Sequence, residues 1–285
     1  MELGRLGVWY SPDRLKGQEI SQFLQILESC GYDTLWYPES TGFESMAIAG
    51  HMLGLTSRLK VGSSIANIYA RDAFTARRGL TLTSLYGDRF ILGLGVSHIP
   101  LVEGVRGHQY EKPVPAMRAY LDGILKGQAG ADEWPVAIAA LGPLMLKLAG
   151  ERTRGALPYN VTPEHTAKAK SILGPSKWLA VEQKVCLETD PAKARALGRA
   201  ELSRYMGLPN YRDNWLRNGF TEAELADGGS DRFIDAMVAW GDADAVRGKL
   251  RAHFDAGATH VCLQPVHAEG DFGARDAMLK ALSDT

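Results

Sequence analysis

The sequence predicts an α/β protein whose parallel strands close into a (β/α)8 barrel, also called a TIM barrel. Eight short apolar runs alternate with helical patterns along the chain, which is typical of strand–helix units in a parallel sheet. The length of 285 residues is close to the ~250 that such barrels usually need. The first run leads into Trp9-Tyr10-Ser11-Pro12 and not into the glycine-rich loop of many open doubly wound sheets, which are the alternative architecture.

The predicted strands consist of continuous apolar or β-branched residues, as expected for strands that are buried on both faces. They cover residues 6–10, 34–37, 59–65, 90–94, 136–139, 155–157, 181–187 and 259–263.

The segments between the strands carry helix signals. The apolar residues of 16–30 follow the i, i+3, i+4, i+7 spacing of an amphipathic helix, and Gly31 ends the run. Asp72 is a suitable cap for a helix over 73–86, and Thr162-Pro163 begins another helix. Further helices are predicted after Gly142-Pro143, from Asp242 or Asp244 to Gly257, and over 272–282.

Two segments are longer than the connections of a barrel need, about 99–115 after the fourth strand and about 207–241 before the last unit. Long excursions in a compact domain are usually lids or binding loops. A peripheral structural extension is the alternative for the second segment. We therefore expect a single barrel domain over residues 1–285 that carries two insertions.

The composition excludes several functional classes. The 32 basic and 33 acidic residues leave a net charge of −1, which argues against a broad nucleic-acid-binding face. No stretch approaches the ~20 apolar residues of a membrane span, and residues 1–5 carry no secretory signal. Cys30, Cys186 and Cys262 are odd in number and widely spaced, which favours free thiols in a reducing cytoplasm over disulfides or zinc ligands.

In a barrel of this kind the active site lies at the carboxyl ends of the strands. Two proton carriers fall there, Glu39 after the second strand and His98 after the fourth, among glycines, small polar residues and aromatics. No metal-ligand spacing and no Gly-x-Ser-x-Gly motif occurs, so neither a catalytic metal nor covalent hydrolysis is expected. The shortage of reactive side chains predicts a bound cofactor. Leu141-Gly142-Pro143 begins a helix whose free amides could seat a phosphate, with an ordinary helix start as the alternative.

Six motifs lie in order along nearly the whole chain. They are residues 34–39 (TLWYPE), 59–71 (LKVGSSIANIYAR), 89–98 (RFILGLGVSH), Gly142-Pro143, 160–165 (NVTPEH) and 256–261 (AGATHV). As an ordered set they resemble the luciferase-like monooxygenase superfamily, in particular its branch that uses the deazaflavin coenzyme F420.

The resemblance implies a coenzyme ring across the barrel mouth, backed by a non-proline cis peptide that falls at Ser64–Ile65 by motif position. It also implies a phosphate near the start of the Gly142-Pro143 helix and near Tyr159-Asn160. The backbone of 95–97 is expected at the ring edge or the ribityl chain, and Asn67 at a hydroxyl or ring carbonyl. The implied coenzyme-binding residues are Ser64, Ile65, Ala66, Asn67, Gly95, Val96, Ser97, Leu141, Gly142, Pro143, Tyr159 and Asn160.

The proton carriers depart from the family pattern. Many relatives place a histidine directly after the second-strand acid, where this chain has Ser40, and some place a glutamate at the position of His98. We expect His98 to move the proton, since imidazole has a reference pKa of about 6.5, and Glu39 to orient or tune it. Backbone hydrogen bonding by His98 and anchoring of the barrel mouth by Glu39 are the alternatives. Trp9 and Tyr10 are expected to line the substrate pocket.

Three functional hypotheses follow from the resemblance. The first is hydride transfer between C5 of the deazaflavin and a small organic substrate, either as alcohol oxidation or as reduction of an activated double bond. The second keeps the fold and uses flavin mononucleotide (FMN) with oxygen as a monooxygenase. The third is a cofactor-binding protein without catalysis. A homodimer is expected at the family level, and Arg71 and Lys147 are interpreted as solvated charges in preference to contacts for an acidic coenzyme tail.

Overall fold

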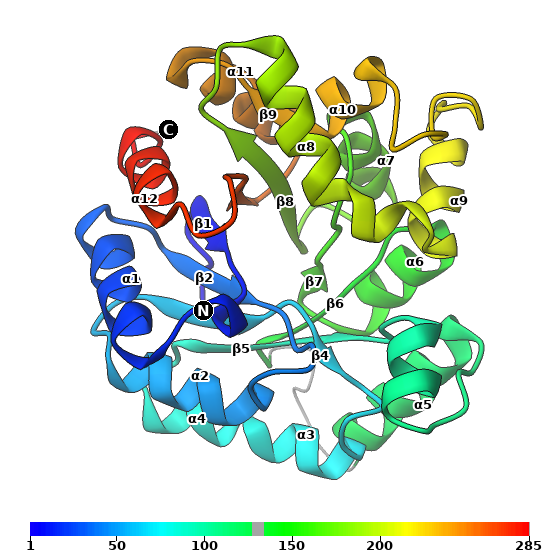
Figure 1. Ribbon diagram of the computed structural model, residues 1–285. Coiled ribbons are helices and arrows are strands. Elements are labelled where there is room, and N and C mark those ends of the chain that lie inside the picture. Colours follow the sequence, from blue (N-terminus) through cyan, green and yellow to red (C-terminus); the bar gives the residue numbers. More distant parts are fainter. Residues whose placement is uncertain (127–133, 285) are drawn as a thin grey trace.

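The computed structural model describes residues 1–126 and 134–284, in which parallel strands form a closed barrel surrounded by helices (Figure 1). The strands are β1 (Leu6–Trp9), β2 (Thr34–Tyr37), β3 (Lys60–Ser63), β4 (Ala66–Asn67), β5 (Phe90–Gly95), β6 (Val136–Ile138), β7 (Gly155–Ala156), β8 (Trp178–Cys186), β9 (Val238–Trp240) and β10 (His260–Pro265).

The ring runs β10-β1-β2-β3-β5-β6-β7-β8, and β8 pairs with β10 to close it. The short β4 follows β3 in the chain and pairs with β5, and β9 pairs with the C-terminal end of β8. All eight predicted strands are present in the ring. The closing pair, in which Val261 lies opposite Val181, confirms the barrel and is incompatible with the open sheet that was the alternative.

The helices lie outside the ring. They are α1 (Gly17–Ser29), α2 (Ser45–Gly54), α3 (Ala73–Gly79), α4 (Thr81–Leu85), α5 (Pro113–Leu125), α6 (Pro143–Arg152), α7 (Pro163–Leu173), α8 (Pro191–Met206), α9 (Pro209–Arg217), α10 (Asp231–Met237), α11 (Ala243–Asp255) and α12 (Phe272–Ala281). None of the described helices is long and apolar enough to cross a membrane.

The predicted caps are in place for three of these helices. The side chains of Asp72, Thr162 and Asp242 accept hydrogen bonds from the backbone at the starts of α3, α7 and α11. The single helix expected over 73–86 is instead two helices that meet at Leu80. The break directly follows Gly79, and glycine is a poor helix former.

The two predicted insertions are ordered elements. The first contains a short π-helix, η2 (Pro100–Val105), and leads to α5. The second contains α9, α10 and β9 and packs with α8 around its own apolar cluster, in which the rings of Trp215 and Phe233 lie 4.8 Å apart. Figure 1 shows α9 (yellow) beside α6, so this insertion reaches the barrel mouth and is not peripheral.

Buried aromatic side chains fill the barrel below its mouth. Trp36, Ile91 and Trp178 belong to this inner cluster, and the indole of Trp36 donates a hydrogen bond of 3.0 Å to Nε2 of His260. Because the interior is packed with side chains, a ligand can enter only above them, at the carboxyl ends of the strands.

Candidate active site

A cleft lies at the carboxyl ends of the strands and has two lobes. Lobe one, about 670 Å³, extends toward Trp9, the loop after β2 and the end of α8. Lobe two, about 490 Å³, extends toward the starts of α5 and α6 and toward α9. The residues that line both lobes are Ile65, Ser97, His98, Ala139, Leu157, Tyr159 and Tyr211. The shared residues make the two lobes one continuous cleft.

The back wall of the cleft is the connection between β3 and β4. The Ser64–Ile65 peptide is cis, as the family resemblance implies. The Ile65 carbonyl accepts a hydrogen bond from the backbone N–H of Glu39 (3.2 Å), and the Ser64 carbonyl accepts one from the indole of Trp9 (3.3 Å). The neighbouring strands therefore hold this backbone segment against the cleft, where Ile65 lines both lobes.

Glycine in β5 lets this wall lie close to the next strand. A Cβ atom on Gly95 would lie 2.4 Å from Cγ1 of Ile65, and one on Gly93 would lie 1.9 Å from the Ser63 carbonyl oxygen. Gly95, Val96 and Ser97 all line lobe two, at the place where the sequence predicts coenzyme contacts.

Ala66 and Asn67 lie behind the wall and do not line either lobe. Both are fully buried. The Asn67 backbone N–H donates to Oε2 of Glu39 at 2.8 Å, its Oδ1 accepts from the N–H of Tyr69, and its Nδ2 has no partner in the described residues. These two predicted contacts are therefore buried supports of the wall in this structure.

Glu39 faces lobe one but is bound to arginine. The guanidinium of Arg71 donates to both carboxylate oxygens of Glu39, with 2.9 Å for the Nη1–Oε2 contact, and Arg106 lies 3.9 Å away. The exposed fractions of the Arg71 and Glu39 side chains are 8% and 4%, so Arg71 is not the solvated charge that the sequence predicts. In the part of the chain that the structure describes, no hydrogen bond or ion pair joins Glu39 to His98, so the structure shows no direct route by which Glu39 tunes His98.

His98 lies where the two lobes meet, and no other histidine of the described residues lines either lobe. Its ring packs on Tyr211 of α9 with 5.6 Å between centroids. Burial lowers the pKa of His98 below its ordinary value, and a side-chain hydrogen bond with Asn210 opposes that shift. Burial therefore favours the neutral imidazole, which can accept a proton from a ligand in the cleft.

Lobe two ends at the start of α6. Leu141, Gly142 and Pro143 line it, and no side chain caps this helix, so its first amides remain available to a ligand. Arg217, from the last turn of α9, lines the same end and forms no ion pair with any described residue. Uncapped amides beside a cation favour an anion. Lys147 is on the solvent side of α6, facing Glu151.

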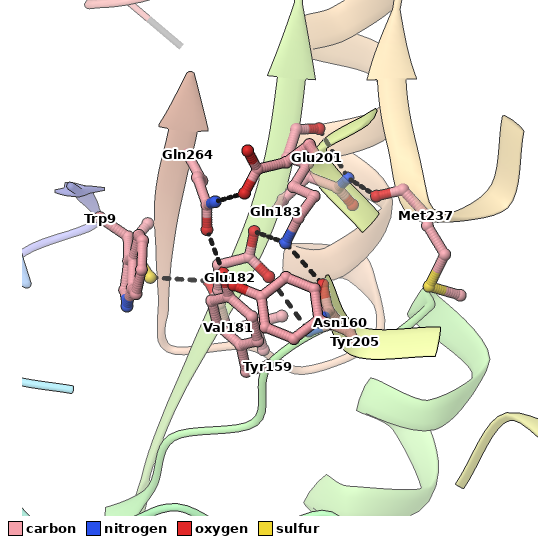
Figure 2. A network of polar contacts seen from close by, with 12 residues as sticks. Trp9, Tyr159, Asn160, Val181, Glu182, Gln183, Glu201, Tyr205, Met237 and Gln264 are labelled. Carbon is pink, nitrogen blue, oxygen red and sulfur yellow. Dashed lines mark hydrogen bonds and ion pairs between the residues drawn. The ribbon is translucent and has the colours of Figure 1, made fainter. Parts of the chain in front are cut away.

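A polar network lies beside Tyr159 (Figure 2). The ammonium of Lys184, which is 1% exposed, donates to Oδ1 of Asn160 (2.5 Å) and Oε1 of Glu182 (3.2 Å) and lies 4.2 Å from the centre of the Tyr159 ring. Burial raises the pKa of Glu182. Tyr159 lines both lobes, but Asn160 is buried in this network and lines neither.

Trp9 and Tyr10 lie on opposite faces of the first strand, since successive side chains alternate. Trp9 lines lobe one, as expected. Tyr10 instead packs outside the ring against Phe23, 4.9 Å between centroids, with the guanidinium of Arg275 over its ring. Its neighbour Ser11 is the next residue to line lobe one.

Residues 3–260 match the family described as luciferase-like monooxygenase. This chain belongs to that family. A protein of Mycobacterium tuberculosis named as a coenzyme F420-dependent oxidoreductase is 35% identical over 158 residues, which cover 54% of this chain and only 44% of that protein. A 5,10-methylenetetrahydromethanopterin reductase of Methanolobus tindarius is 24% identical over 85% of this chain and 89% of its own.

Solved structures share the fold of this luciferase-like protein. An F420-dependent secondary alcohol dehydrogenase, in complex with an F420–acetone adduct, has a TM-score of 0.75 and 15% identity over 99% of both chains. The FMN-bound oxygenating constituent of 3,6-diketocamphane monooxygenase from Pseudomonas putida has a TM-score of 0.73 and 14% identity over 98% of this chain and 97% of its own. These likenesses establish the barrel architecture.

Sequence reasoning missed the part of this luciferase-like site that comes from α9. Asn210, Tyr211, Asp213 and Arg217 all line lobe two. The available signal was an aromatic and polar cluster in an oversized insertion, which is typical of a binding loop. Sequence reasoning also missed the charges of β8, although Glu182-Gln183-Lys184 interrupts an otherwise apolar strand.

Proposed function

We propose that this luciferase-like protein is a coenzyme F420-dependent oxidoreductase that transfers a hydride between C5 of the deazaflavin and a small organic substrate. The relative from M. tuberculosis supports the choice of coenzyme by its name. The observation that carries the proposal is the form of the cleft. A backbone wall lies at Ser64–Ile65, and the far end of lobe two has an uncapped helix start beside Arg217, which forms no ion pair with the residues that the structure describes.

The residues of the cleft fit a flat ring with a phosphate-bearing tail. Ile65 and Gly95 leave a wall without long side chains, against which a planar ring can lie. The amides that begin α6, together with Arg217, would hold the phosphate. When bound, the deazaflavin supplies a two-electron carrier that takes or gives a hydride at C5 and activates oxygen poorly. The protein has to orient the two partners and exclude water.

His98 is the group that moves the proton in this proposal. As a neutral imidazole it accepts the hydroxyl proton when an alcohol is oxidised, and as an imidazolium it returns that proton in the reverse direction. Glu39, held by Arg71, supports the wall through its backbone hydrogen bonds with Ile65 and Asn67 and does not itself exchange a proton with the substrate. Trp9 shapes the substrate end of the cleft in lobe one.

A titration of the apo-protein with each coenzyme tests the proposal. We expect deazaflavin to bind more tightly than FMN, followed by changes in absorbance and in tryptophan fluorescence. Bound coenzyme should then exchange hydride with a substrate, and His98→Ala should reduce this exchange. Tighter binding of FMN, or no binding of either coenzyme, would contradict the proposal.

An FMN-dependent monooxygenase is the second candidate, because an FMN-bound enzyme shares the barrel. Substrate-dependent oxygen consumption with reduced FMN would favour it. A cofactor carrier without catalysis is the third, and coenzyme binding without any turnover would favour it.

We also propose a homodimer in a reducing cytoplasm. The three cysteines are free thiols, which fits that compartment. Sedimentation of the purified protein tests the dimer, and cell fractionation tests the location.

A further inference from the structure

Two arginines line the mouth of lobe one on the side away from the phosphate end. Arg14 comes from the 3-10 turn η1 (Pro12–Arg14) after β1, and Arg204 comes from the last turn of α8. Their side chains are 35% and 50% exposed, so both are open to a ligand that enters from solvent. Neither arginine has a role in the function proposed above.

One carboxylate, that of Glu201, holds both arginines at this mouth. Its Oε2 accepts a hydrogen bond of 2.9 Å from Arg204 and lies 3.6 Å from Nη2 of Arg14. Its Oε1 accepts from Nε2 of Gln264 at 2.8 Å (Figure 2). Glu201 therefore lies within reach of both guanidinium groups and holds them side by side.

The guanidinium groups keep most of their hydrogen-bond donors free. A guanidinium has five N–H donors. Arg204 uses one of them on Glu201, and the Arg14 side chain forms no hydrogen bond at all with the described residues. Arrays of this kind match a carboxylate, which can accept two parallel N–H donors.

The carboxylate of Asp13 also lines this mouth, so the four charged side chains are neutral overall and the preference for an anion rests on the free guanidinium donors. The Oδ1 atom of Asp13 accepts the backbone N–H of Phe43 at 2.9 Å, and Asp13 forms no ion pair within the described residues. It therefore fixes the loop after β2, and Arg14 and Arg204 keep the donors that an incoming anion needs.

We propose that Arg14 and Arg204 form a subsite for the carboxylate of the organic substrate, which makes that substrate a small carboxylic acid with an apolar body. The proposal rests on the function proposed above for the identity of the reaction. The wall between the arginines and His98 is aromatic, with Trp9, Tyr205 and Tyr211, and suits an apolar body. The acidic tail of the coenzyme is a less suitable occupant, because its phosphate is expected at the opposite end of the cleft.

Calorimetric titration of the full-length protein with a matched pair of probes, phenylacetate and its neutral amide 2-phenylacetamide, tests the subsite. We expect the wild type to bind the carboxylate roughly tenfold more tightly at low salt, which corresponds to one charge-assisted contact. Arg14→Gln combined with Arg204→Gln should abolish this preference. Arg212→Gln, which removes an arginine paired with Glu222 outside the cleft, should leave it unchanged.

The same variants are titrated with coenzyme F420 to separate the outcomes. Unchanged coenzyme affinity together with loss of the carboxylate preference supports the subsite. Loss of coenzyme affinity with an unchanged probe preference would assign the arginines to the coenzyme tail and overturn the subsite. Equal affinity of the wild type for the two probes also overturns it. If the wild type prefers the carboxylate but binds no deazaflavin, the proposed coenzyme is wrong and the anionic subsite stands.

Discussion

Replacement of Arg71 by methionine should destabilise the protein strongly, because it leaves the Glu39 carboxylate buried without its main partner. Methionine keeps the length and apolar stem of the side chain and removes the guanidinium. Arg71 provides two hydrogen bonds to Glu39 and one of 2.8 Å to Glu44. The contact with Glu44 matters little, since Glu44 is 54% exposed and water replaces the guanidinium there.

The magnitude follows from the burial of the pair and from what remains after the substitution. Removing one partner of a buried ion pair costs about 3–5 kcal/mol. Glu39 keeps the Asn67 backbone N–H at 2.8 Å and the distant charge of Arg106 at 3.9 Å, so we expect a loss near the lower end, about 3 kcal/mol. The double variant Glu39→Gln/Arg71→Met removes both charges and should lose only about 1 kcal/mol.

Urea unfolding followed by circular dichroism measures these losses. Arg212→Met is the control, because the partly exposed pair that Arg212 forms with Glu222 should contribute less than about 0.5 kcal/mol. A loss for Arg71→Met no larger than that of the control would refute the buried-pair reasoning. A double variant less stable than Arg71→Met would refute it as well, and would give the Glu39 carboxylate a function that glutamine cannot replace.

Three further predictions concern the cleft. Gly95→Ala should lower coenzyme affinity on the order of tenfold by pushing Ile65 forward, whereas Gly17→Ala, which lies outside the cleft and whose Cβ would meet nothing within 4 Å, should not. Arg217→Gln should weaken coenzyme binding roughly tenfold at low salt and less at high salt. For the oxidation reaction, kcat/KM should decrease only below about pH 6.5, because burial lowers the pKa of His98 and protonation removes the base. The variant His98→Gln should abolish this decrease at low pH. A pH profile that His98→Gln leaves unchanged would exclude His98 as the base.

The fold could be predicted from sequence because its signals are local. Strands buried on both faces need continuous apolar runs, and those runs occur at all eight positions of the ring. Helix caps such as Asp72 and Thr162 accept a hydrogen bond from a backbone N–H only three residues later in the chain. They can therefore be recognised without knowledge of the tertiary structure. The break after Gly79 was missed because a glycine within a helical pattern is often tolerated.

The candidate site could be predicted only in part, because its contacts connect distant segments. The motifs of the family resemblance predicted the cis peptide at Ser64–Ile65, and these residues and the start of α6 line the cleft; their contacts with a coenzyme stay a prediction. The partner of Glu39 could not be predicted, since Arg71 is 32 residues away and nothing in the sequence distinguishes it from a solvated arginine. Tyr10 was wrongly predicted to line the cleft for a different reason. Side chains alternate along a strand, so only one of two neighbours points inward, and the sequence at the end of the strand does not identify which one.

The division of the cleft between barrel and insertions has a consequence for specificity. The wall that would face a coenzyme ring is the connection between β3 and β4 together with the end of β5, fixed by backbone hydrogen bonds and by glycines in β5 that leave room for Ile65. The mouth of lobe one is built from the turn after β1 and the end of α8, outside the ring. Changes at Arg14 or Arg204 can therefore alter the charge of the accepted substrate without disturbing the barrel. Changes at Gly95 act on the wall itself, so they affect every substrate alike.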